Sequence, residues 1–161
     1  TPGTVASESY VIELLKQDPT LIVTQQSCPM WVPLIEAGEH LGDGANYFVE
    51  KYLTELLTRD PLIDTIILGC THYPLLQPKI EAFLSSIAHS QSPVTNHRIS
   101  VVSQGSIVAD SFADYLHRHP EFSQDSKGGT CKYLTTESAA KFSESASIFL
   151  SEPITAHHIE L

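Results

Sequence analysis

The strongest constraint on the fold is a short apolar stretch typical of a strand. A turn follows it, and then apolar residues at the spacing of a helix. Residues 62–68 are rich in β-branched side chains and predict a buried strand of a parallel sheet. Gly69 permits a tight turn or a close approach of the backbone to a ligand. Pro78 suits the first turn of a helix. Apolar residues then recur at helical spacing, at Ile80, Phe83, Leu84 and Ile87.

The turn after this strand carries three side chains with useful chemistry. Cys70, Thr71 and His72 follow the carboxyl end of the strand, which is where open α/β sheets bind ligands. A free thiol has a pKa of about 8.5, so it needs a helping neighbour to act as a base near neutrality. His72 can give that help, and Thr71 offers a hydroxyl and a backbone N–H to an anion. A Cys-x-His pair alone is weak evidence, since buried free cysteines are mostly inert.

The rest of the chain alternates between the two kinds of apolar pattern. Helical spacing recurs around residues 10–15, 45–56, 107–116 and 142–149. Strand-like stretches lie between these helices, at residues 21–24, 98–102, 131–135 and 157–161. Residues 103–105 predict a turn and residues 85–96 a polar linker, while Thr136 or Ser138 can cap the last helix. The alternation predicts an α/β fold, with a parallel sheet covered by helices on both faces.

Composition excludes several classes of protein. Hydrophobic residues make up 42% of the 161 and charged residues 17%, which is typical of a globular chain. The net charge of −10 disfavours nucleic acid as a partner. The sequence has no apolar run long enough to span a membrane and no signal segment. Its 3 cysteines form no Cys-x-x-Cys pair, which disfavours disulfides and a structural metal and predicts a cytoplasmic location.

Residues 68–76 (Leu-Gly-Cys-Thr-His-Tyr-Pro-Leu-Leu) resemble the second cysteine signature of bacterial glutamate racemases, cofactor-independent enzymes that make D-glutamate for peptidoglycan. Three further segments resemble that family in the same order, at residues 1–7, 27–39 and 133–150. The family's Asp-Ser-Gly-x-Gly motif and its first catalytic cysteine, in a Cys-Asn-Thr-like motif, do not occur in this sequence. We therefore expect the chain to be the C-terminal portion of a longer racemase.

The resemblance also implies an arrangement of lobes. Glutamate racemases have two α/β lobes that face each other across the active site, and the C-terminal segment crosses back to complete the first lobe. Residues 1–92 are expected to form the second lobe and residues 93–97 a linker. Residues 98–161 are expected to form the C-terminal part of the first lobe.

The implied chemistry is racemisation by two thiols on opposite faces of the substrate, without a cofactor. Cys70 resembles the catalytic cysteine that acts on L-glutamate, and its partner is expected in the portion that this sequence lacks. His72 is expected to assist Cys70 and to tune its protonation. Glu36 resembles the glutamate that polarises the same side, although Glu39 lies close enough in sequence to leave this assignment open.

The resemblance places three threonines at the substrate. Thr71, Thr4 and Thr1 match positions near the glutamate carboxylates, where hydroxyls and backbone amides can bind an anion. The alternative for Thr1 and Thr4 is a capping role, with Thr4 at the start of a helix. Cys28 is expected to be a buried, inert thiol, and Cys131 is assigned no role.

Other functions remain open at this point. An aspartate or hydantoin racemase, or a related decarboxylase, is the nearest enzymatic alternative. Such relatives commonly have another residue after Gly-Cys-Thr, so His72 favours glutamate. The alternative of another class is a non-catalytic lobe that binds a ligand. L- and D-glutamate are the expected partners, with no nucleic acid and no membrane, while regulation by a cell-wall precursor and a homodimer stay open.

Overall fold

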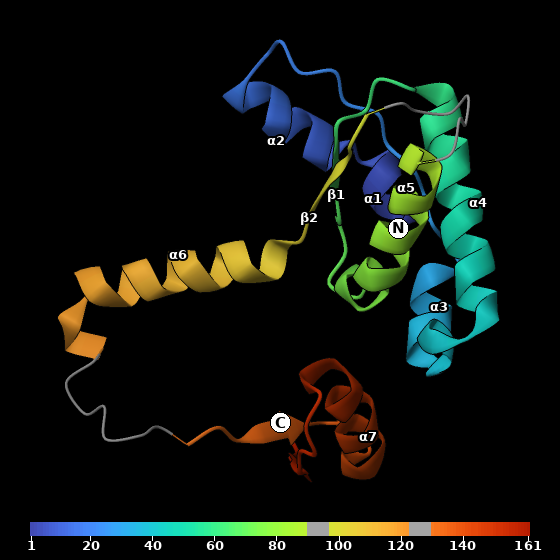
Figure 1. The fold of residues 1–161 in the computed structure, drawn as a ribbon. Helices are drawn as coiled ribbons and strands as arrows, with labels where there is room; N and C mark the ends of the chain where they lie inside the picture. The colour runs from blue at the N-terminus through green and yellow to red at the C-terminus, as the bar shows by residue number, and fades with distance from the viewer. Residues whose placement is uncertain (90–96, 123–129) are drawn as a thin grey trace. The chain divides into compact units, whose positions relative to one another are not determined.

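The computed structural model describes residues 1–89, 97–122 and 130–161 (Figure 1). Its α-helices are α1 (Pro2–Ala6), α2 (Ser9–Gln17), α3 (Trp31–Glu36), α4 (Asp43–Arg59), α5 (Gln77–His89), α6 (Gln104–Arg118) and α7 (Ala139–Leu150). Short 3-10 helices are η1 (Glu39–Leu41), η2 (Tyr73–Leu76) and η3 (Pro120–Phe122). The strands are β1 (Thr65–Ile67), β2 (Ser100–Val102), β3 (Tyr133–Thr135) and β4 (Ala156–His158).

The described residues divide into two compact units, Thr1–Ile107 and Val108–Leu161. In the first unit β1 and β2 pair in parallel, with Ile66 opposite Val101. In the second unit β3 and β4 also pair in parallel. Parallel strands alternating with helices confirm the predicted α/β fold class.

The core of the first unit lies where α4 and α5 pack against the β1 segment. One stripe of α4 is buried at positions four residues apart, Val49, Leu53 and Leu57. From α5 and the end of β1 come Ile80 and Leu68, also buried. Burying such a side chain stabilises a fold by about 1.5–3 kcal/mol, so this stripe fixes α4 beneath the sheet.

The second unit is held together around α7. Ser138 caps this helix by accepting a hydrogen bond from the Lys141 N–H at 3.4 Å, which confirms one of the two predicted caps. Within the helix, the Ser143 hydroxyl accepts from the Ala156 N–H at 2.9 Å and so ties β4 to α7.

Three local predictions were wrong. Residues 21–24 form no strand, because none of the described residues pairs with them. α6 begins at Gln104, where a turn was predicted. Helix α5 continues to His89, five residues into the linker predicted at residues 85–96, because residues 85–88 keep the helical pattern.

The division between the units does not fall at the predicted linker. Residues 93–96 of that linker lie outside the described residues. Strand β2 follows the linker but pairs with β1, so it belongs to the same compact unit. The assignment of residues 1–92 and 98–161 to two lobes of a larger protein stays a prediction. Among the described residues, none of the helices has the length and apolar content needed to cross a membrane.

Candidate active site

The candidate site lies just beyond the carboxyl end of β1. The Leu68 N–H donates to the Val102 carbonyl at 2.9 Å, which holds the end of the strand against β2. Two residues later Cys70 begins a turn, closed by the Tyr73 N–H donating to the Cys70 carbonyl at 3.2 Å. His72 then occupies the first position before η2. The strand and this short helix therefore fix both ends of the Cys70–His72 segment.

Gly69 packs against α2 in front of the turn. A Cβ at this position would lie 3.4 Å from the ring of Tyr10, at the short end of ordinary van der Waals contact. The Tyr10 hydroxyl in turn accepts a hydrogen bond from the Gln104 side chain at 2.5 Å. Tyr10 was predicted only as part of a helix face, because nothing in the sequence links it to a residue 59 positions later.

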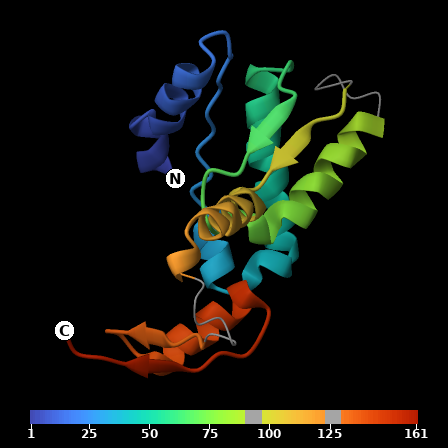
Figure 2. The ribbon, with the colours of Figure 1, turned by 90° about the vertical axis from the view of Figure 1, so that its left-hand side faces the viewer.

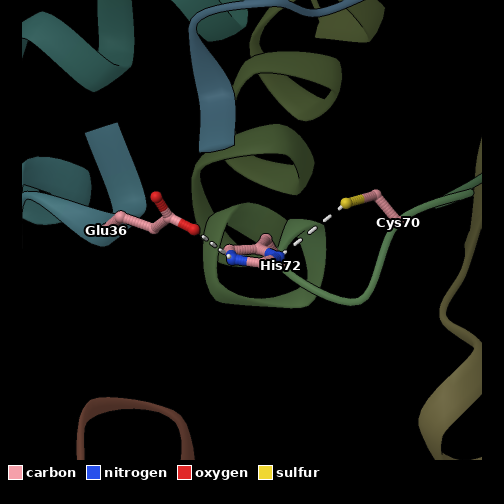
Figure 3. Close-up of polar contacts among 3 residues, drawn as sticks. All are labelled: Glu36, Cys70 and His72. Atoms are coloured by element: carbon pink, nitrogen blue, oxygen red, sulfur yellow. Dashed lines mark hydrogen bonds and ion pairs between the residues drawn. The ribbon is translucent and has the colours of Figure 1, made fainter. Parts of the chain in front are cut away.

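Cys70, His72 and Glu36 form a connected chain of side chains (Figure 3). The Cys70 Sγ lies 3.9 Å from His72 Nδ1, at the long end for a hydrogen bond to sulfur. On the other side of the ring, His72 Nε2 lies 3.2 Å from Glu36 Oε1. The imidazole therefore bridges the thiol and the carboxylate.

This geometry favours one tautomer of His72. A carboxylate only accepts hydrogen bonds, so the Nε2 facing Glu36 carries the hydrogen. In the neutral ring Nδ1 then presents a lone pair towards the Cys70 thiol. Taking the thiol proton there creates a thiolate next to an imidazolium, whose charge Glu36 stabilises. The arrangement can thus serve as a switchable acid and base.

Glu36 is the last residue of α3. The helix is anchored by Ile35, which is fully buried, and by Trp31, whose Nε1–H donates to the Phe48 carbonyl at 3.2 Å. The Glu36 side chain keeps 63% of its surface exposed, against 24% for His72. The carboxylate that meets His72 is that of Glu36, whereas Glu39 lies in η1.

The three threonines predicted to bind substrate have different surroundings. Thr71 is exposed between Cys70 and His72. Thr1 is the N-cap of α1 and accepts from the Thr4 N–H at 3.3 Å, while the two hydroxyls lie 2.8 Å apart. The capping alternative therefore holds for Thr1, whereas Thr4 lies within α1 and donates the N–H that Thr1 accepts. A substrate-binding role for Thr71, Thr4 and Thr1 stays a prediction.

Cys28 is buried, as predicted, and lies apart from this chain of side chains. Its Sγ donates to the Gln26 carbonyl at 3.8 Å. Burial raises the pKa of the Cys28 thiol to about 12. The same cause raises the pKa of Tyr73, whose ring meets Trp31 edge-on at 4.7 Å. A thiol in this state is protonated at neutral pH and unreactive.

Because Cys28 is buried, the stability of the fold should fall at alkaline pH. Below pH 9 both folded and unfolded chains keep the proton, whereas between pH 9 and about 12 only the folded chain does. Stability should therefore fall as pH rises, by about 1.4 kcal/mol per pH unit from this group. Urea unfolding across this range, on the unmodified chain and on Cys28→Ala, measures the difference in slope. Parallel curves for the two chains would contradict the assignment.

The described residues show no arrangement for a metal: across 1–89, 97–122 and 130–161, no three His, Cys, Asp or Glu side chains cluster to hold an ion.

No family model matches the sequence. Among curated proteins, the glutamate racemase of Lactiplantibacillus plantarum is 33% identical over all of this chain and 55% of its own length. The glutamate racemase of Cereibacter sphaeroides is 37% identical over 96% of this chain and 52% of its own length. The chain thus spans about half the length of the curated relatives it matches.

Solved structures of glutamate racemases resemble this chain in fold as well. A glutamate racemase from Bacillus anthracis superposes on all of this chain and 55% of its own, with a TM-score of 0.77 at 29% identity. The glutamate racemase of Francisella tularensis, in complex with D-glutamate, superposes on all of this chain and 54% of its own, with a TM-score of 0.78 at 23% identity. In sequence and fold, the chain matches the C-terminal portion of a bacterial glutamate racemase.

Proposed function

We propose that this chain supplies the Cys70 half of a cofactor-independent glutamate racemase, which interconverts L- and D-glutamate. The observation that carries the proposal is the Cys70–His72–Glu36 chain at the carboxyl end of β1. It occurs in a sequence that matches glutamate racemases over about half their length. The relative from Francisella tularensis was solved with D-glutamate, which supports glutamate as the ligand.

The proposed reaction removes the proton from one face of the α-carbon and delivers a proton to the opposite face. The Cys70 thiolate removes the α-proton of L-glutamate, and a second group on the opposite face returns a proton to give D-glutamate. In the reverse direction the Cys70 thiol donates its proton to the α-carbon. His72 takes or returns the thiol proton through Nδ1, and Glu36 holds the ring and stabilises its charge. The second group belongs to the portion that relatives carry beyond the matched half.

Substrate binding is assigned to the threonines by resemblance. Thr71 stands between Cys70 and His72 in the sequence and is exposed, so its hydroxyl can meet a carboxylate. The Thr1 and Thr4 hydroxyls lie 2.8 Å apart, so one donates to the other and the second keeps its O–H for a substrate carboxylate. A cytoplasmic location and a role in peptidoglycan synthesis complete the proposal, while a regulating cell-wall precursor and a homodimer stay open.

Two alternatives to glutamate racemisation predict different properties of this site. An aspartate or hydantoin racemase would use the same thiol but another substrate, and substrate preference decides between them. A ligand-binding lobe without catalysis would have no use for a linked acid–base chain. The contact between His72 and Glu36, residues 36 positions apart in sequence, favours catalysis.

The role of His72 can be tested in a chimera, in which the N-terminal part of the Lactiplantibacillus plantarum glutamate racemase is joined to Thr1. His72→Asn should lower kcat from L-glutamate by about 100-fold and kcat from D-glutamate by less, because each thiol serves one face. The equilibrium constant links the two kcat/KM values, so kcat in each direction and the α-deuterium isotope effects are the quantities to measure.

Glu36→Gln is the matched variant for the same experiment. It keeps the size of the side chain and removes the charge, so it should lower kcat less than His72→Asn does. Isotope effects unchanged from the parent chimera in both directions would remove His72 from the proton-transfer step.

A further inference from the structure

Tyr10 of α2 packs against the backbone immediately before Cys70. Its ring carbons Cε2 and Cζ lie 3.4 Å from the position of a Cβ on Gly69, and its hydroxyl oxygen lies 3.7 Å from that position. The ring edge that carries the hydroxyl therefore occupies the place where another residue would put its side chain. Gly69 has no side chain to hold it and belongs to the most conformationally free residue type. Contact with Tyr10 limits this freedom at the residue next to the thiol.

The hydroxyl of Tyr10 is bonded to the start of α6. The Gln104 Nε2 donates to it at 2.5 Å, although the two residues are 94 positions apart in sequence. Gln104 is the first residue of α6, and Figures 1 and 2 show that α6 starts where β2 ends. The bond is partly buried, so water competes with it less than with a bond at the surface.

The same pair of strands sets the positions of Gln104 and Cys70. The Leu68 N–H donates to the Val102 carbonyl at 2.9 Å, and Cys70 and Gln104 each lie two residues beyond this bond. Tyr10 then joins the two segments again, through its ring on one and its hydroxyl on the other. These contacts form a closed loop. The turn that carries Cys70 cannot shift relative to the start of α6 without disturbing one of them.

The contact between the thiol and the imidazole depends on where this turn lies. The Cys70 Sγ is 3.9 Å from His72 Nδ1, so there is little distance to spare for a hydrogen bond to sulfur. The His72 ring has a second anchor in Glu36, at 3.2 Å. A small shift of the turn backbone therefore moves the thiol relative to a ring that Glu36 holds. Misplacing a reacting group by about 1 Å can lower a rate on the order of 100-fold.

We propose that Tyr10 and Gln104 are positioning residues for the Cys70 thiol. Their hydrogen bond holds the aromatic ring against Gly69, and the ring in turn keeps the thiol within reach of His72. This inference rests on the proposed function, because that function makes Cys70 the group whose position matters. Packing alone would need the ring of Tyr10 but not its hydroxyl. Removing the hydroxyl therefore separates positioning from packing.

The first test needs no catalysis and uses the 161-residue chain. Nitrogen NMR records the resonance of His72 Nδ1 with the imidazole in its neutral form. Cys70→Ala gives the position of this resonance when no thiol donates to the ring. Tyr10→Phe should move the resonance most of the way from the parent position to that of Cys70→Ala. The matched control is Tyr47→Phe, which removes an exposed hydroxyl from α4 and should leave the resonance at the parent position.

Two variants of Gln104 examine the other end of the bond. Gln104→Leu keeps an apolar side chain without a donor and should reproduce the NMR shift of Tyr10→Phe. Gln104→Glu presents an acceptor, so the Tyr10 O–H can donate to it and the bond is restored in the opposite direction. The Nδ1 resonance of Gln104→Glu should therefore stay near the parent position. A role in packing alone predicts no such difference between the two variants.

The second test is a double-mutant cycle on kcat in the chimera. Tyr10→Phe should lower kcat from L-glutamate by about tenfold, and kcat from D-glutamate by less. In a chimera that already carries His72→Asn, the same substitution should lower kcat by less than about twofold, because the contact that Tyr10 maintains is already lost. Losses that multiply in full would show that Tyr10 acts on the fold and not through the thiol.

Three results would overturn the proposal. The first is an Nδ1 resonance that Tyr10→Phe leaves unchanged. The second is an independent effect of Tyr10→Phe and His72→Asn in the cycle. The third is the same Nδ1 resonance in Cys70→Ala and in the parent, which would mean that there is no thiol contact to maintain. Failure of the proposed function is a different observation, because Cys70→Ala would then keep the turnover of its parent chimera. In that case the NMR result still decides whether Tyr10 and Gln104 hold the thiol.

Discussion

Replacing Cys70 by alanine should lower kcat for glutamate racemisation in the chimera by about 10²–10⁴-fold, the usual worth of one acid–base group. The reason is that each face of the α-carbon needs its own proton carrier, and His72 reaches the reacting centre through the thiol. Circular dichroism follows racemisation directly in both directions, as the loss of the ellipticity of the starting enantiomer. Cys70→Ser should be nearly as inactive, because a serine hydroxyl is a far weaker acid than a thiol.

Cys131→Ala is the matched control for this experiment. Cys131 is an exposed thiol in the second unit, and its removal should leave kcat and KM unchanged. A Cys70→Ala chimera with the turnover of its parent would remove Cys70 from the mechanism. Equal losses for Cys70→Ala and Cys131→Ala would assign the effect to general thiol chemistry and not to this site.

The 161-residue chain by itself should have no measurable racemase activity. Holding two groups and a substrate in reacting geometry is worth about 7–11 kcal/mol in favourable cases. The second acid–base group has to lie across the substrate from Cys70. Cys28 is buried with its pKa raised to about 12, so it cannot take that part. The missing group therefore removes most of the rate enhancement.

The measurement compares the isolated chain with the chimera at equal concentration, starting from D-glutamate and from L-glutamate. Activity should be found in the chimera alone. Conversion of D- to L-glutamate by the isolated chain, abolished by Cys70→Ala, would show that both bases lie within these residues.

Local sequence patterns predicted the parts of the fold that depend on nearby residues. The stripe of α4 and the strand–turn–helix unit around Gly69 both follow from apolar spacing along one segment. The same is true of Ser138, whose capping role needs only the three residues after it. Strand pairing is not local in this sense. Residues 21–24 have strand composition but no strand partner among the described residues, so the pattern alone could not predict their state.

In the candidate site, too, some contacts could be predicted from nearby residues and others arise only from the fold. Cys70 and His72 are two positions apart, and their contact could be predicted from the turn. Glu36 came from resemblance, and sequence left Glu39 as an alternative because both follow the same motif. Only the fold brings the end of α3 to the His72 ring. The contact of Tyr10 with Gly69 had no sequence signal, because it depends on how α2 packs over β1.

Exchange of the α-proton tests the central claim most directly, that Cys70 with His72 and Glu36 is the base for L-glutamate. The chimera is incubated with L-glutamate in D₂O, and proton NMR follows the α-proton signal without any coupling enzyme. The parent chimera should replace this proton by deuterium as it turns over, and Cys70→Ala should not do so above the rate in buffer. Loss of the α-proton at the same rate with Cys70→Ala as with the parent would contradict the claim.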